Sequence, residues 1–159
     1  MDSFSTLGFA RDPLYSFMKS YSDFELAYLI IHEQTHATLF VKGQTQFSEE
    51  LASFMGEEGA LTWLGETQGV GSPGHRMAMD ELADSQTFLS LLRRLADGLD
   101  HVYRSPLSKE EKLAEKIRII AAFQADFASG KQALFRTESY RQMGVPNVNN
   151  AYLALYSLY

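Results

Sequence analysis

The chain has 159 residues, 45% of them hydrophobic and 13% aromatic, which is enough for one compact domain that buries about two-thirds of its unfolded surface. Its formal net charge of −6, with no basic block, makes nucleic acid and anionic membrane surfaces poor partners. Because it contains no cysteine, disulfides, thiolate metal sites and cysteine nucleophiles are excluded, and any metal must be bound by His, Asp and Glu.

The first twenty residues differ from the rest of the chain. Residues 4–9 favour one extended strand, Asp12-Pro13 favours a turn, and residues 14–19 favour a short helix. We expect at most this one short N-terminal strand. Residues 1–4 have neither a basic leader nor an apolar core, so we expect no secretory signal within this chain.

The clearest helix begins at Ser22. Ser22 and Glu25 have the spacing of a capping box, in which each side chain bonds to the other residue's backbone amide. The helical pattern continues to Lys42, and Gly43 is the expected C-terminal stop. The apolar run within this helix is far shorter than the roughly 20 residues of a membrane span, so we expect no transmembrane segment.

A second helix is predicted to follow at once. Ser48 is its expected N-cap, and its pattern ends near Gly65. Only residues 43–47 separate it from the preceding helix, so the two are expected to pack as an antiparallel pair over residues 22–65.

The remaining residues, 76–159, are expected to form a helical bundle, which makes the fold mainly α. The predicted parts are a glycine-rich loop over 69–74, a helix over 76–103, a helix from the Ser108 and Glu111 capping box to about Ala128 that ends at Gly130, a weaker helix over 132–142, a loop over 144–147, and a last helix capped by Asn149 or Asn150.

A His-Glu-x-x-His motif, His32 to His36, lies in the first predicted helix. At about 100° per residue, the two histidines lie within about 40° of each other on one helix face, with Cβ atoms about 5–6 Å apart. This arrangement suits two imidazoles that bind one ion. Glu33 lies about 100° round the helix from His32, where it is better placed beside a metal-bound water than on the metal.

A catalytic zinc site normally needs a third protein ligand and one open position. Glu49 and Glu50 are candidates because they begin the next helix, and His75 in the glycine-rich loop is a third possibility. The structural alternative is a hydrogen-bonded histidine pair on a half-buried face, with the glutamates as solvated carboxylates near a helix N-terminus.

These segments resemble the gluzincin zinc peptidases, and within them a predicted bacterial aminopeptidase family distantly similar to aminopeptidase N. The resemblance covers nearly the whole chain and rests on residues 5–14, on residues 29–36 with the zinc motif, on residues 47–60, and on Asn149-Asn150-Ala151 near the end. In that family the glutamate equivalent to Glu49 is the third zinc ligand. Ser48 stands where the family usually has asparagine.

The resemblance implies a zinc aminopeptidase with one Zn²⁺ per chain, held by His32, His36 and Glu49. Zinc would lower the pKa of its water towards about 7, and Glu33 would act as the general base that activates this water against a peptide bond. Gluzincins generally use a tyrosine as the second oxyanion donor, for which Tyr159 is the first candidate, with Tyr103 and Tyr140 as alternatives.

Three further residues are candidates for binding the peptide substrate. Glu57 lies two helical turns beyond Glu50 and is a candidate for the substrate α-ammonium group, with a solvated carboxylate as the alternative reading. Asn149 and Asn150 match the family's closing motif, and we expect them to contact substrate.

The family's proteins are about twice this long, so the resemblance implies that the chain is the C-terminal catalytic half of a longer parent, one that in this family would be a bacterial lipoprotein or periplasmic protein. Three alternatives compete with the aminopeptidase interpretation: a compact gluzincin endopeptidase, a zinc-binding domain without turnover, and a non-catalytic helical interaction module. Measurement of bound zinc separates the last of these from the others.

Overall fold

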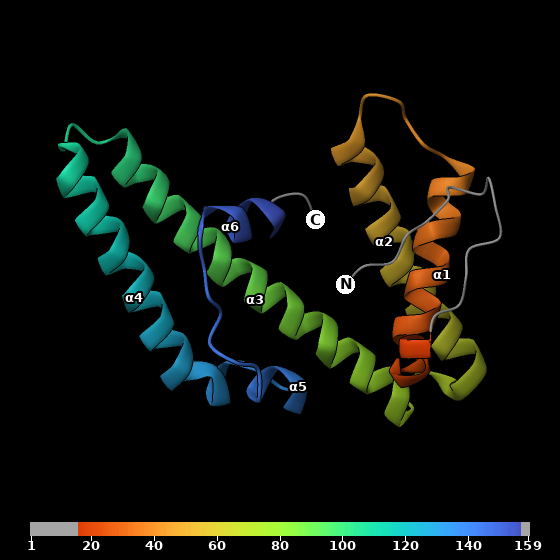
Figure 1. The fold of residues 1–159 in the computed structure, drawn as a ribbon. Helices are drawn as coiled ribbons and strands as arrows, with labels where there is room; N and C mark the ends of the chain where they lie inside the picture. The colour runs from red at the N-terminus through yellow and green to blue at the C-terminus, as the bar shows by residue number, and fades with distance from the viewer. Residues whose placement is uncertain (1–15, 157–159) are drawn as a thin grey trace. The chain divides into compact units, whose positions relative to one another are not determined.

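The computed structural model describes residues 16–156, and the regular secondary structure within them is all helical (Figure 1). The elements are η1 Ser16–Ser20, α1 Asp23–Thr38, α2 Thr45–Leu64, the π-helical turn η2 Gly65–Gly69, α3 Pro73–Arg104, α4 Lys109–Leu134, α5 Glu138–Arg141 and α6 Asn150–Tyr156. The predicted mainly α fold is confirmed. The predicted strand over residues 4–9, the Asp12-Pro13 turn and Tyr159 lie outside the described residues. Of the helices described, none is long and apolar enough to span a membrane.

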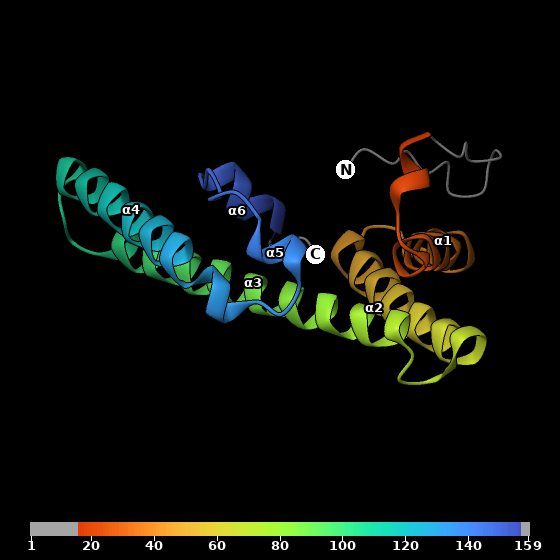
Figure 2. The ribbon, with the colours of Figure 1, turned by 90° about the horizontal axis from the view of Figure 1, so that it is seen from below.

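The helices group into two compact units that meet in sequence within α3, at Met79 and Asp80. The first unit contains α1 and α2, which lie side by side (Figures 1 and 2). On α2 the buried positions recur every fourth residue and most are small: Ser48, Ala52, Gly56, Ala60 and Leu64. Small side chains at this spacing let the two backbones approach closely.

The capping box that starts α1 is present as predicted. Ser22 Oγ accepts the Glu25 backbone N–H at 3.2 Å, and Glu25 Oε2 accepts the Ser22 backbone N–H at 2.7 Å. The predicted helix end at Lys42 is wrong, because α1 ends at Thr38 and Leu39 is already extended. Gly43 serves the connection instead, where its φ of 81° favours glycine.

The predicted start of the second helix at Ser48 is also wrong. Helix α2 begins one turn earlier, at Thr45. Ser48 is therefore inside the helix and fully buried, and its hydroxyl accepts the backbone N–H of Val41 at 3.2 Å. The serine therefore joins the start of α2 to the segment that follows α1, and it does not cap α2.

In the second unit, α4 runs alongside the C-terminal part of α3 (Figure 2). The capping box of Ser108 and Glu111 starts α4 as predicted. One core cluster joins α3 to α4 and to the segment after it, and a second joins α3 to the segment before α6. The first contains Phe88, Leu92, Phe127 and Phe135, and the second contains Leu95, Leu99 and Val148.

The predicted stop of this helix at Gly130 is wrong, as is the separate helix predicted over residues 132–142. Helix α4 passes through Gly130 to Leu134, and between Leu134 and Gln142 only the short α5 is helical. The break has a physical cause in α3, because the buried Asp84 carboxylate accepts the backbone N–H groups of Arg136 at 2.8 Å and Thr137 at 2.7 Å. Its Oδ2 also accepts the Thr137 hydroxyl at 2.7 Å.

We expect Asp84→Asn to destabilise the fold by about 2 kcal/mol at pH 7, because an amide nitrogen would then face a backbone N–H donor. Burial alone raises the pKa of Asp84, but the hydrogen bonds from Arg136 and Thr137 outweigh it, so the pKa lies below its usual value. A depressed pKa means that this stabilisation is present above the unfolded pKa of about 3.9 and is lost as pH falls through the folded-state value.

Urea titrations between pH 7 and pH 2 measure this effect, with Asp80→Asn as the control. Asp80 is one turn earlier on α3, and its exposed pair with Arg136 at 3.2 Å is expected to contribute less than about 1 kcal/mol. Equal stability losses in the two variants would show that Asp84 has no special role in ending α4.

Candidate metal centre

The two histidines of the motif lie one turn apart on α1 and are both buried. Their Nε2 atoms point at one another and are 3.1 Å apart, and their rings meet nearly edge to face at an interplanar angle of 84°. The helix thus presents two ring nitrogens to one point, as the spacing predicts.

Glu49, in the second turn of α2, brings a carboxylate to the same point. Its Oε2 lies 3.6 Å from His32 Nε2 and 3.5 Å from His36 Nε2. The preceding residue, Ser48, holds this end of α2 through its bond to Val41. Among the residues described, these three side chains form a group whose ligand atoms could hold a metal ion.

The spacing of the three ligand atoms fits zinc. A tetrahedral zinc ion with ligand distances of about 2.0–2.1 Å separates its ligand atoms by about 3.3 Å. The separations here, 3.1, 3.5 and 3.6 Å, bracket that value. Two imidazoles and one carboxylate are also a donor set that catalytic zinc sites use, with the fourth position open.

The electrostatics of His32 favour its neutral form. Burial lowers the pKa of His32, and the neighbouring His36 lowers it further, while Glu33 and Glu49 act in the opposite direction. The neutral ring is the form that binds metals. For both histidines the Nδ1 atom is buried and has no hydrogen-bond partner among the described residues.

Glu33 lies next to His32 on α1 but does not belong to the group of three ligands. It is partly buried, and its Oε2 is a buried oxygen without a hydrogen-bond partner in the described part of the chain. Leaving a buried carboxylate oxygen without a donor costs free energy. Such a group is available to accept a proton or a hydrogen bond from a molecule bound beside it.

A family model described as "Putative aminopeptidase" matches residues 1–159, which is the whole chain. The chain belongs to this family. No curated protein and no solved structure matches it. The predicted resemblance to an aminopeptidase family is thus confirmed, and peptides are the expected substrates. The narrower assignment to the gluzincins stays a prediction.

The other candidate ligands lie outside the group of three. Glu50 is exposed, and its Oε1 accepts a hydrogen bond from Gln46 Nε2 at 2.6 Å. His75 does not lie in a loop as predicted, because α3 begins at Pro73 and includes it. Its backbone N–H bonds to Ser72 Oγ at 3.2 Å, which places it in the first turn of that helix.

Of the candidates for substrate contact, Glu57 lies in the same unit as the metal centre, on α2. It is half-buried, and burial together with the neighbouring Glu58 raises the pKa of its carboxyl. Asn149 and Asn150 belong to the second unit. Asn149 Oδ1 accepts the Tyr152 backbone N–H at 2.9 Å, as a helix N-cap does, and Asn150 Oδ1 accepts the Tyr103 hydroxyl at 3.2 Å.

The tyrosines proposed as oxyanion donors have different surroundings. Tyr103, the first alternative, is partly exposed and makes the bond to Asn150. Tyr140 packs in the core of the second unit, with ring centroids 5.2 Å from Phe135 and 6.3 Å from Phe88. Tyr159 lies outside the described residues.

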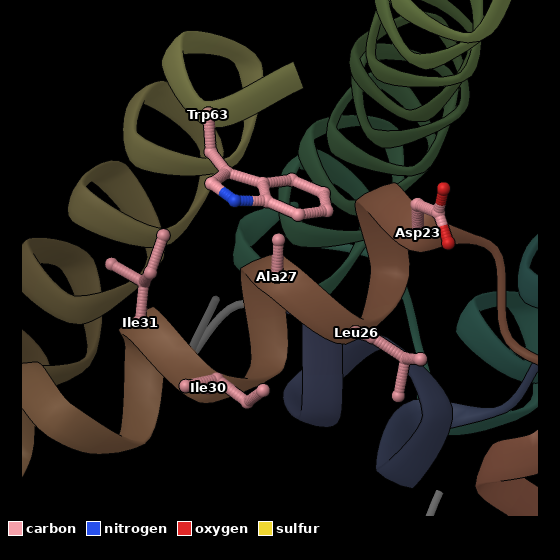
Figure 3. A pocket seen from close by; sticks show the side chains of 6 residues that line it. All are labelled: Asp23, Leu26, Ala27, Ile30, Ile31 and Trp63. Carbon is pink, nitrogen blue, oxygen red and sulfur yellow. The ribbon is translucent and has the colours of Figure 1, made fainter. Parts of the chain in front are cut away.

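An apolar hollow of about 300 Å³ lies beside α1 but is not part of the metal centre. Ile30 lines this hollow. Because residues two positions apart on a helix point about 200° apart, the hollow is on the opposite side of α1 from His32. Figure 3 shows Trp63 extending from α2 over Ala27. A second hollow is lined by Ile30, Leu51 and Met55 among others. None of the three ligands or Glu33 lines either hollow.

The roles of two residues at the centre were not predicted from the sequence. The first is Ser48, which holds the start of α2 through its bond to Val41. The second is Tyr28, whose ring lies 5.6 Å from that of His32. The four-residue spacing from Tyr28 to His32 and His36 is a signal that the sequence does contain, because residues at this spacing share a helix face.

Proposed function

We propose that the chain is a zinc-dependent aminopeptidase of the gluzincin type, in which His32, His36 and Glu49 hold one Zn²⁺. The observation that carries the proposal is the convergence of three ligand atoms from two helices at separations of 3.1 to 3.6 Å. Membership of an aminopeptidase family supplies the reaction class, the hydrolysis of peptide bonds.

Zinc, when bound at such a site, acts as a Lewis acid and lowers the pKa of a coordinated water towards about 7. Glu33 is the proposed general base, because it is beside His32 yet outside the ligand group, and its buried Oε2 has no described hydrogen-bond donor. It would take a proton from the attacking water and give it to the leaving amine. A general base placed in this way typically contributes a factor of 10² to 10⁴ to the rate.

The residues that bind the substrate belong to the same proposal. Glu57 is the proposed partner of the substrate α-ammonium, supported by its half-buried carboxylate on the helix that carries Glu49. Roles for Asn149, Asn150 and Tyr159 stay predictions from the family resemblance.

Metal analysis of the 159-residue chain, purified without added zinc, tests the proposal. We expect about one equivalent of zinc per chain and hydrolysis of peptides that have a free N-terminus. Cleavage within N-terminally blocked peptides would instead show an endopeptidase. Absence of zinc, together with failure to bind it when it is added, would overturn the proposal in favour of a non-catalytic helical domain.

A further inference from the structure

Four aromatic contacts run along α1 and into the segment after it, and the two site imidazoles lie within this row. The rings recur every fourth residue, and the successive centroid distances are 6.5, 5.6, 4.8 and 6.2 Å through Phe24, Tyr28, His32, His36 and Phe40. Of the two rings next to the imidazoles, Tyr28 is half-buried and Phe40 is exposed.

His32 needs something to fix its ring plane. A histidine that binds a metal usually donates its second ring N–H to a carboxylate or carbonyl, which sets the tautomer and orientation. In the described residues the buried Nδ1 of His32 has no such partner. What the structure does place against this imidazole is the Tyr28 ring, at 5.6 Å and tilted by 38°.

Tyr28 is itself held by α2. A Cβ atom at Gly56 would lie 2.9 Å from both Cδ2 and Cε2 of the tyrosine ring and 3.1 Å from its backbone oxygen, so only glycine leaves room for this ring. At the far end of the ring, the hydroxyl donates a long hydrogen bond of 3.5 Å to Ser53 Oγ. The tyrosine ring thus lies against both α2 at Gly56 and the His32 imidazole.

We propose that Tyr28 is a positioning residue for the metal centre: its ring, seated against Gly56, holds the His32 imidazole in the orientation that points Nε2 at the shared ligand position. The inference rests on the proposed zinc site, but it concerns a contact that is present in the chain itself. The physical basis is that an imidazole already held in place loses less rotational freedom when it binds a metal. Removal of the Tyr28 ring therefore weakens the metal affinity.

Zinc affinity, measured by competition with a chromophoric chelator, tests this role directly. We expect Tyr28→Leu to weaken zinc binding about tenfold, within the range of 10 to 100 found when outer groups around metal ligands are removed. Tyr28→Phe keeps the ring and should bind zinc within about threefold of the unchanged chain. Phe40→Leu, which removes the exposed ring beside His36, is the control and should leave the affinity unchanged.

A second pair of variants guards against loss of folding in Tyr28→Leu. Gly56→Ala on α2 forces a methyl group against the Tyr28 ring on α1. Gly59→Ala, also on α2, forces a methyl group to within 2.9 Å of Ile31 Cδ1 on α1. Both crowd the α1–α2 interface, but only the first displaces the ring beside His32. We expect weaker zinc binding and an altered visible spectrum of the Co²⁺-loaded chain for Gly56→Ala alone.

Each outcome decides one question. If the unchanged chain binds no zinc, the proposed function fails and this role fails with it. If the unchanged chain binds zinc and Tyr28→Leu binds it equally well, or if Gly59→Ala perturbs the Co²⁺ spectrum as much as Gly56→Ala, the metal site stands and Tyr28 has no positioning role.

Discussion

Glu33→Gln is expected to keep its zinc and to lose at least a hundredfold in turnover. Glutamine has the size of glutamate but cannot take a proton from water at neutral pH, so the variant removes only the general base. The metal should remain because Glu33 lies outside the group formed by the two histidines and Glu49. Metal content and the rate of hydrolysis of an aminoacyl p-nitroanilide, measured on the same preparation, separate the two effects.

Glu66→Gln serves as the matched control. It makes the same chemical change in an exposed carboxylate on η2, in the same unit of the chain, and we expect its turnover to match that of the unchanged chain. Loss of zinc in Glu33→Gln would contradict the assignment, because Glu33 would then be a ligand. Full activity with zinc bound would remove Glu33 from the mechanism.

Local features of this chain were predictable from its sequence. Both capping boxes, at Ser22 and at Ser108, form as their spacing indicates. The two histidines converge because positions four apart on a helix share a face whatever else the chain does. These outcomes depend on one helix at a time, which is why sequence spacing alone is sufficient.

Features that depend on contacts between segments were not predictable in this way. The residues alone left Glu49 and Glu50 open as ligands, since adjacent positions differ by about 100° around α2. The choice depends on the rotation of α2, which its connection to α1 and the Ser48–Val41 bond help to set. Likewise, Gly130 does not end α4, because the chain breaks where Asp84 takes the backbone N–H groups of the following residues.

Replacing any one of the three proposed ligands by alanine is expected to abolish stoichiometric zinc. Two ligands hold zinc far less well than three, and the chain has no cysteine to compensate. His32→Ala, His36→Ala and Glu49→Ala should each weaken binding more than a hundredfold. Equilibrium dialysis followed by elemental analysis gives the zinc content, and circular dichroism shows whether each variant keeps its helices.

Glu50→Ala and His75→Ala test whether one of these residues, rather than Glu49, is the third ligand. The first alters the neighbouring carboxylate, which is exposed and bonded to Gln46, and the second alters the histidine at the start of α3. We expect both to retain one equivalent of zinc. If Glu49→Ala kept its zinc while either of these lost it, the third ligand would come from that residue, and the 3.5 and 3.6 Å contacts of Glu49 with the histidines would be electrostatic contacts only.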